Sequence, residues 1–176
     1  LNSVICETMN DDTMPSIFEQ IDSAMECRKA NHIDLILGGP PCQGFSVAGK
    51  MDPDDPRSKL IFTFLDVVER VKPRAFVMEN VKALGVLEKW ESVRQEYIQR
   101  ASKLGYFCMP FVLNATEYNV PQKRERLFVV GIRKELKKLP FEFMPSQGYV
   151  TTIRDALFAG RLYTTDVPHS EGAVYN

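Results

Sequence analysis

The sequence predicts an α/β domain with a mostly parallel sheet and helices on both faces. Short segments that are apolar throughout alternate with segments whose apolar residues recur at helical spacing. Strands that are apolar on both sides are typical of a parallel sheet buried between helices. The chain has 176 residues, which is enough for one domain with a sizeable core.

Four apolar segments are predicted to be strands. They cover residues 33–39, 74–80, 107–115 and 125–134. The polar segment 44–58 is rich in glycine and proline and is predicted to be a loop.

Four segments with helical spacing are predicted to be helices. They cover residues 13–31, 59–71, 90–106 and 152–160. Asp12 or Thr13 can cap the first helix, because a short side-chain oxygen there can accept from free backbone N–H groups. Lys72-Pro73 is expected to stop the second helix, and Gly105 is expected to cap the C-terminal end of the third.

Composition excludes several classes of protein. Hydrophobic residues make up 44% of the chain and the net charge is −1, which argues against disorder and against a uniformly basic nucleic-acid binder. No apolar run is long enough to span a membrane. The four cysteines are scattered without a CxxC pair, so no metal site is predicted and an intracellular setting is favoured. His32 and His169 have no partners at metal-ligand spacing.

Two reactive side chains follow two of the predicted strands. Cys42 comes just after the first strand, and Glu79 lies at the end of the second. Ligands of open α/β sheets bind beyond the carboxyl ends of the strands, so these two residues are expected to form one site.

The turn before Cys42 favours a catalytic thiol over a buried structural one. Most lone cysteines are small buried hydrophobes. Here Gly38 and Gly39 permit close approach of another group, and Pro40 and Pro41 fix the direction of the turn. A rigid turn that presents a thiol suits nucleophilic catalysis.

The basic segment Gln122–Arg126 allows two interpretations. Such charge runs are usually solvated surface. In an extended run, however, Gln122, Arg124 and Arg126 share one face, which suits contacts to a base edge and to phosphates. We favour nucleic-acid contact over solvated surface for Arg124 and Arg126, and we favour neither interpretation for Gln122.

Several motifs, taken in order, resemble the DNA (cytosine-5)-methyltransferase family. "GGPPCQGFS" resembles its nucleophile block, "MENV" its glutamate block, "QKRERLFVVGI" its basic block and "TIRDAL" the block before target recognition. "DPRSKL" is similar to the segment after the family's mobile loop. The resemblance implies a partial Rossmann-like, S-adenosylmethionine-dependent methyltransferase fold.

The resemblance also implies the reaction. A methyl group would pass from S-adenosyl-L-methionine to carbon 5 of cytosine in double-stranded DNA, after base flipping and addition of Cys42 to carbon 6. Glu79 would share a proton with ring nitrogen 3. Arg124 and Arg126 would complete the catalytic set. A role in restriction–modification is implied as well.

Further residues are assigned by the same resemblance. Expected cofactor contacts are Pro41, Leu60 and, on a looser match, Glu7. Expected nucleic-acid contacts are Gln43, Ser46, Arg57 and Gln122. The loop from Gln43 to Arg57 is predicted to close over the flipped base.

The family's glycine-rich cofactor block and its target-recognition region have no match in the chain. We therefore expect residues 1–157 to be a catalytic domain lacking that block, and 158–176 to lead towards target recognition. Either a truncated enzyme or one subunit of a split enzyme would fit, with a second chain or further segments supplying the remainder. Alternatives are a tRNA cytosine-5 methyltransferase and a non-catalytic nucleic-acid-binding remnant. The expected location is the bacterial cytoplasm near the nucleoid, or the nucleus in a eukaryote.

Overall fold

The computed structural model describes residues 6–10, 12–41, 59–136, 143–145 and 151–158. The chain divides into two compact units, and each is described by itself. The first contains residues 1–112 and 126–140, and the second contains residues 113–125 and 141–176. The domain boundary expected at residue 157 stays a prediction.

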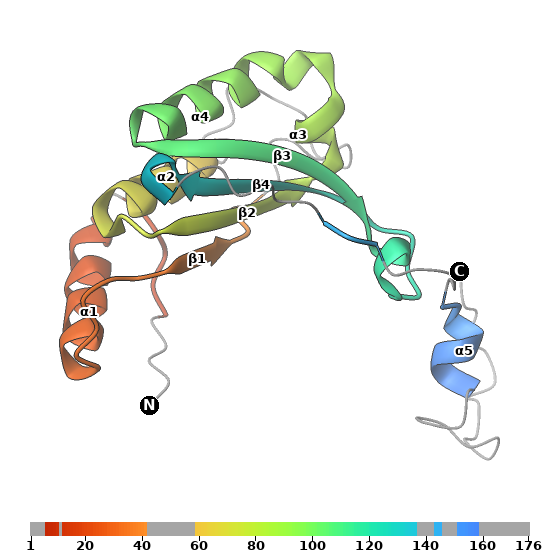
Figure 1. Cartoon of the computed structure of the whole chain (residues 1–176), viewed down its shortest axis with the longest axis horizontal. Helices are drawn as coiled ribbons and strands as arrows, with labels where there is room; N and C mark the ends of the chain where they lie inside the picture. Colours follow the sequence, from red (N-terminus) through yellow and green to blue (C-terminus); the bar gives the residue numbers. More distant parts are fainter. Residues whose placement is uncertain (1–5, 11, 42–58, 137–142, 146–150, 159–176) are drawn as a thin grey trace. The chain divides into compact units, whose positions relative to one another are not determined.

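All four predicted strands are present and form one sheet (Figure 1). They are β1 (Leu35–Gly38), β2 (Ala75–Val81), β3 (Tyr106–Asn114) and β4 (Glu125–Arg133). Their order in the sheet is β1-β2-β4-β3, so β1 and β3 are the edge strands. Pro110 lies within β3, which fits an edge position because proline cannot donate to a sheet ladder.

The α/β class is confirmed, and the strand directions add a detail to the expected mostly parallel sheet. β1 pairs parallel with β2, as a crossover through a helix requires. β4 pairs antiparallel with β2 over seven residues, from Ala75 opposite Ile132 to Val81 opposite Arg126. The described sheet is therefore mixed, because β4 is inserted between β2 and β3 in the reverse direction.

The four predicted helices are also present. They are α1 (Met14–Cys27), α2 (Leu60–Val71), α4 (Glu91–Lys103) and α5 (Ile153–Phe158). A short helix that was not predicted, α3 (Lys82–Val86), follows β2 directly. Single 3₁₀ turns occur at η2 (Glu88–Trp90), η3 (Ala115–Tyr118) and η4 (Lys134–Leu136).

The helix ends agree with the sequence in two cases and differ in one. Lys72 ends α2 in the left-handed conformation, directly before Pro73, and Gly105 has a φ of +91° after α4. Thr13 occupies the N-cap position of α1, but its side chain makes no capping hydrogen bond. Instead Asn10 Oδ1 accepts from the backbone N–H groups of Asp12 and Thr13, so the turn before the helix takes over the predicted capping role.

The core of the first unit lies between the sheet and the helices α2 and α4. Ile61, Leu65 and Val68 of α2 meet Phe76 and Met78 of β2 in one cluster. The aromatic members of that cluster are Phe64, Phe76, Trp90, Tyr97 and Tyr106. Met14 and Ile17 of α1 pack on Val67 at the outer side of α2.

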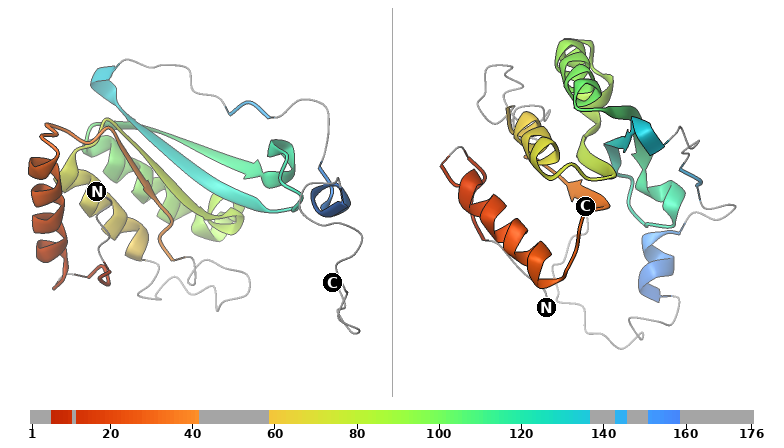
Figure 2. Two further views of the ribbon diagram at one scale, coloured as in Figure 1. Left: turned by 90° about the horizontal axis from the view of Figure 1, so that it is seen from below. Right: turned by 60° about the vertical axis from the view of Figure 1, so that its left-hand side comes forward.

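The described helices of the first unit cover one face of the sheet, whereas helices were expected on both. Seen from below in Figure 2, the strands lie in front and α2 and α4 lie behind them. On β1, Leu35 and Leu37 are 49% and 69% exposed. An apolar strand predicts burial, but it does not indicate which crossover covers which face.

Candidate active site

The carboxyl ends of β1 and β2 meet at one edge of the sheet. Gly38 pairs with Met78, so Gly39 and Pro40 follow β1 where Glu79 and Asn80 continue β2. A Cβ atom on Gly39 would lie only 3.2 Å from Glu79 Oε2. The glycine at this position therefore lets the carboxylate approach the turn, as the sequence predicted for these glycines.

Gly38 serves a second close approach. A Cβ atom there would come within 2.4 Å of the Phe64 ring of α2. Gly38 thus allows the end of β1 to pack closely against Phe64 of the core, and Gly39 allows the turn to pack closely against Glu79.

An ion pair links Glu79 to β4. Arg126 Nε lies 3.0 Å from Glu79 Oε1, with side chains 25% and 37% exposed. Glu79 pairs with Phe128, so Arg126 is two residues along β4 and projects from the same side of the sheet. The structure thus brings together two of the four predicted catalytic residues.

Asn80 contributes a contact that sequence reasoning missed. Its side chain is 1% exposed, and its Nδ2 donates to the carbonyl oxygen of Pro40 at 3.2 Å. Its Oδ1 accepts from the N–H of Val81 at 2.9 Å. The signal in the sequence was an amide within an otherwise apolar strand, directly after the predicted catalytic carboxylate.

Several predicted residues lie outside the described part of the chain. These are Cys42, Gln43, Ser46 and Arg57, together with the whole loop predicted to act as a lid. Pro41, the residue before Cys42, is described and exposed.

Gln122 and Arg124 belong to the second unit and are exposed. β4 begins only at Glu125, and the N–H of Gln122 donates to the carbonyl oxygen of Val120 at 2.7 Å, which makes a tight turn. β4 thus begins where the strand was predicted, and the tight turn at Gln122 lies before it. A face shared by Gln122, Arg124 and Arg126 stays a prediction.

A cavity lies beside the turn, between the N-terminal parts of α1 and α2. Its volume is about 470 Å³, within the range of small-molecule sites. Pro41 and Leu60, both predicted to contact the cofactor, line it. Apolar side chains from α1, β1 and α2 form most of the remaining wall, including Ile17, Ile21, Ile36, Leu37 and Phe64.

Glu7, the third predicted cofactor residue, lies next to this cavity in sequence but is engaged with α1. Its Oε1 accepts from Gln20 Nε2 at 2.9 Å and from Ser16 Oγ at 3.3 Å. The residues after it, Thr8 and Met9, line the cavity.

Of the three cysteines that the structure describes, one is partly buried and two are exposed. Burial raises the pKa of the Cys108 thiol to about 12, although Lys134 opposes the shift. Cys108 is therefore a neutral thiol near pH 7. Cys6 and Cys27 are exposed.

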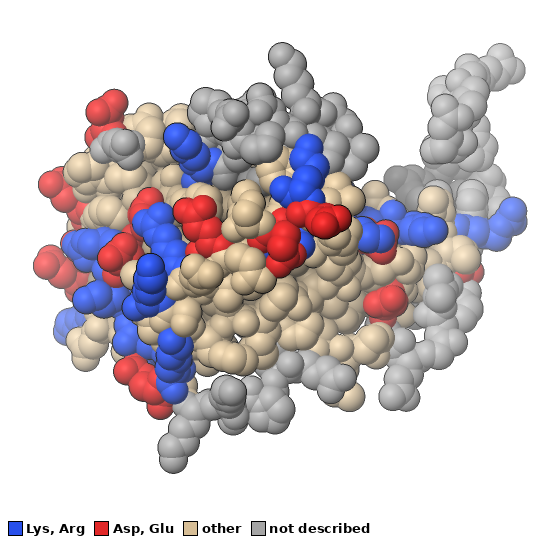
Figure 3. Space-filling view, turned by 90° about the horizontal axis from the view of Figure 1, so that it is seen from above, with Lys and Arg blue, Asp and Glu red and all other residues tan. Residues whose placement is uncertain are grey.

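Three further features of the described ranges concern metal ligands, membrane-spanning helices and surface charge. Those residues contain no group of three or more His, Cys, Asp or Glu side chains that could hold a metal ion. In the same ranges no helix is long and apolar enough to cross a membrane. Lys and Arg side chains are interspersed with Asp and Glu on the face seen from above in Figure 3.

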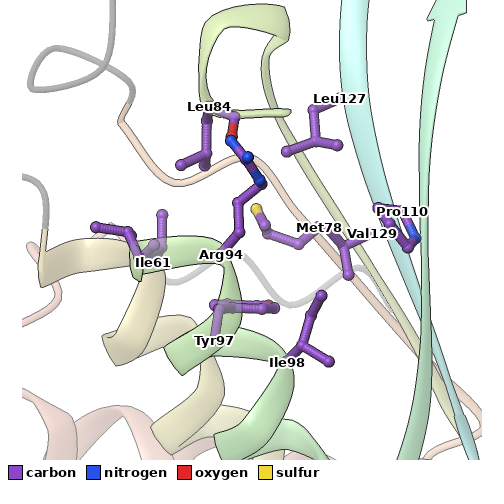
Figure 4. Close-up of a pocket in the computed structure, with 10 residues that line it drawn as sticks. Ile61, Met78, Leu84, Arg94, Tyr97, Ile98, Pro110, Leu127 and Val129 are labelled. Atoms are coloured by element: carbon purple, nitrogen blue, oxygen red, sulfur yellow. The ribbon is translucent and has the colours of Figure 1, made fainter. Parts of the chain in front are cut away.

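A second, small cavity lies inside the core of the first unit (Figure 4). Met78, Leu84, Leu127 and other apolar side chains line it, together with the stem of Arg94 and the ring of Tyr97. None of its lining residues also lines the cavity beside the turn, and most of them belong to the core cluster.

Comparison with known families decides the identity of this arrangement. The sequence model described as C-5 cytosine-specific DNA methylase matches residues 4–168 of the chain. The chain belongs to this family. The expected α/β methyltransferase fold agrees with membership of the C-5 cytosine-specific DNA methylases.

Curated relatives in the methylase family are Type II methyltransferases. M.PspPI of a Psychrobacter species is 43% identical over 147 residues, which are 81% of this chain and 35% of that protein. M.Eco47II of Escherichia coli is 40% identical over 149 residues, 82% of this chain and 35% of that protein. The chain thus spans about a third of the length of these methylases.

A solved structure supports the same fold. A prophage-encoded DNA modification methyltransferase from E. coli is 32% identical, with a TM-score of 0.63. The match covers 85% of this chain and 39% of that one.

Proposed function

We propose that this chain carries the nucleophile and proton-donor half of a DNA (cytosine-5)-methyltransferase. One observation carries the proposal: the Arg126–Glu79 ion pair lies directly against the Gly39–Pro41 turn that leads into Cys42. Family membership supplies the class of reaction, and this cluster supplies residues able to perform it.

Cys42 has the role of nucleophile. Carbon 5 of cytosine is too weak a nucleophile to take a methyl group directly. Addition of the thiolate sulfur to carbon 6 forms a C–S bond and moves the ring's electron pair towards carbon 5, which becomes an enamine carbon. Loss of the carbon 5 proton later expels the thiolate and restores Cys42.

Glu79 balances the charge that this addition creates. Negative charge enters the ring when the thiolate adds, and a carboxyl group that shares a proton with nitrogen 3 offsets it. Arg126, 3.0 Å away, fixes the orientation of the carboxyl group through its guanidinium. Arg124 is proposed as a further cationic contact to the base or to phosphates.

The cavity beside the turn fits the methyl donor. S-adenosyl-L-methionine, when bound, supplies an electrophilic methyl group on its sulfonium sulfur. The apolar walls suit the flat adenine ring, with Pro41 and Leu60 as the proposed contacts. Glu7 can contribute only by exchanging its bonds to Ser16 and Gln20.

Double-stranded DNA is the proposed substrate, with the target base flipped out of the helix so that both of its faces can be reached. Gln43, Ser46, Arg57 and Gln122 are the proposed contacts, and the loop after Cys42 is the proposed lid. The resemblance to Type II methyltransferases favours a modification enzyme acting in the bacterial cytoplasm. Further segments or a second chain would supply target recognition, and the boundary near residue 157 marks the proposed transition.

A covalent trap tests the proposal. The protein, as its full gene encodes it, is mixed with S-adenosylmethionine and a pool of random-sequence duplexes in which 5-fluorocytosine replaces cytosine. Fluorine at carbon 5 cannot leave as a proton does, so the Cys42 adduct should accumulate and survive a denaturing gel. Cys42→Ser should abolish the adduct, and Cys27→Ser, which alters an exposed cysteine away from the site, should leave it unchanged.

Absence of any adduct in the unmodified protein would contradict the proposal, and two further results would do the same. The first is an adduct that persists in Cys42→Ser. The second is an adduct that forms on 5-fluorocytosine-containing tRNA and not on DNA, which would favour the tRNA enzyme.

A further inference from the structure

Two of the three residues in the turn that leads into Cys42 lack the backbone donor that normally helps to hold a strand end in place. A parallel ladder continues only while each strand offers N–H groups to its neighbour. Pro40 and Pro41 have no N–H, so the pairing of β1 with β2 is recorded only as far as Gly38 and Met78. The carbonyl oxygen of Pro40 still requires a donor, because few backbone acceptors in folded proteins go without one.

The side chain of Asn80 supplies that donor. Its Nδ2 lies 3.2 Å from the Pro40 carbonyl oxygen, across the gap where a ladder bond would otherwise form. Its Oδ1 is held by the N–H of Val81 at 2.9 Å, which fixes the orientation of the amide. With tyrosine and tryptophan left aside, Asn80 is the only polar or charged residue fully buried among those the structure describes.

We propose that Asn80 is a positioning residue that fixes the nucleophile turn relative to Glu79. This inference rests on the proposed function, because it concerns how the thiol of Cys42 is aimed. Asn80 is adjacent to Glu79 on β2, and its partner Pro40 is two residues before Cys42. One buried amide therefore sets the spacing between the strand that carries the carboxylate and the turn that precedes Cys42.

The close contact of Gly39 with Glu79 also helps to fix the position of the turn. It places the turn against the carboxylate from one side, while Asn80 holds the next peptide carbonyl. Neither contact requires Asn80 to touch the base. A change at Asn80 should thus alter the rate of covalent addition more than the affinity for DNA.

The test compares two variants in the 5-fluorocytosine trapping assay, with the protein as its full gene encodes it. Asn80→Asp keeps the acceptor for Val81 but loses the donor to Pro40. Asn80→Ala loses both without adding charge. Each should slow adduct formation at saturating DNA at least tenfold, with the dissociation constant for the same duplex pool changed less than twofold.

Asn114 provides the matched control. Its side chain also accepts a backbone hydrogen bond at a strand end, from the N–H of Thr116, but it makes no recorded contact with the turn. Asn114→Asp and Asn114→Ala should form the adduct at the rate of the unmodified protein.

The pH profile distinguishes positioning from an electrostatic effect. A new carboxylate at position 80 that only raised the thiol pKa would slow Asn80→Asp at pH 7 and leave it near normal at pH 9. A displaced turn leaves both variants slow from pH 6 to pH 9. Normal rates in Asn80→Ala, or recovery at high pH, would overturn the inference.

A measurement on the unmodified protein covers the case in which the variants do not fold. In a ¹⁵N spectrum, the side-chain amide of Asn80 should exchange with solvent at least tenfold more slowly than that of a free asparagine. Free exchange would show that the link to Pro40 is absent. Absence of any adduct in the unmodified protein, or an adduct in Cys42→Ser, would instead refute the proposed function. The exchange rate of the Asn80 amide would then still test whether its hydrogen bond to Pro40 exists.

Discussion

Two buried tyrosines of the core differ in a single hydrogen bond. Tyr97 and Tyr106 are each 2% exposed. The hydroxyl of Tyr106 donates to the carbonyl oxygen of Pro73 at 2.6 Å, whereas the hydroxyl of Tyr97 has no partner among the described residues. Burial of a hydroxyl without a partner costs free energy, so the two side chains should respond oppositely to its removal.

We predict that Tyr97→Phe raises the free energy of unfolding by about 1 kcal/mol, because it removes an unsatisfied buried hydroxyl. Tyr106→Phe, the matched change, should lower it by about 1 kcal/mol, because the Pro73 carbonyl loses one of its two donors and keeps Arg133 Nε. Urea unfolding of both variants measures the two effects. A loss of stability in Tyr97→Phe as large as that in Tyr106→Phe would show that the first hydroxyl is satisfied after all.

At the scale of single residues, the sequence predicted which side chains are reactive better than it predicted which residues they contact. Glu79 could be assigned from its place at a strand end, and the structure adds Arg126 beside it. The role of Asn80 could not be predicted, because its partner Pro40 is 40 residues away in the chain. Arg133 also looks like surface charge in the sequence, yet it donates to the carbonyl oxygens of Pro73 and Lys72 at the end of α2.

At the scale of elements, one arginine of α4 holds the segment that follows the glutamate strand. Nη1 of Arg94 donates to the carbonyl oxygens of Leu84 and Leu87, both at 2.8 Å. The side chain is 17% exposed and also pairs with Glu91 of its own helix. Arg94 thus ties α3 and the turn after it to α4 (Figure 4).

We predict that Arg94→Ala lowers the free energy of unfolding by about 2 kcal/mol, because two partly buried carbonyl groups lose a charged donor. Gln95→Ala serves as the control, since Gln95 is exposed and bonds only to Glu91 among the recorded contacts. Its effect should stay within about 0.5 kcal/mol. Thermal or urea unfolding measures the stability of both variants. Equal losses of stability in the two would contradict the role assigned to Arg94.

The elements themselves were largely predictable, and their pairing was not. Apolar runs and helical spacing identified four strands and four helices, because these patterns are local. The insertion of β4 between β2 and β3 depends on pairing between segments some 50 residues apart, such as Ala75 with Ile132. The short helix α3 was missed because five residues, Lys82–Val86, are too few to show a period.

At the scale of the whole molecule, several acidic groups that burial keeps protonated make stability depend on alkaline pH. Burial raises the pKa of Cys108 to about 12 and raises the pKa values of Tyr97 and Tyr106. In the unfolded chain these groups lose their protons at lower pH. The unfolded state therefore binds fewer protons above pH 9, so the free energy of unfolding must fall as pH rises.

For Cys108 the affected window runs from its ordinary pKa of 9.0 to about 12. Within it, this one group should lower the free energy of unfolding by up to about 1.4 kcal/mol per pH unit. Cys108→Ala should be less stable at pH 8 because of the cavity it leaves, yet show a shallower decline from pH 9 upwards. Urea unfolding at a series of pH values tests this, and parallel declines in the two proteins would contradict it.

Both edges of the described sheet are poor templates for adding a strand from another molecule. β1 offers only four residues, and β3 is interrupted by Pro110, which lacks the N–H that an incoming strand would bind. Edge-to-edge growth is the usual route from an exposed sheet to fibrils. The fold can therefore leave Leu35 exposed on one face while the edges of the described sheet resist aggregation by sheet extension.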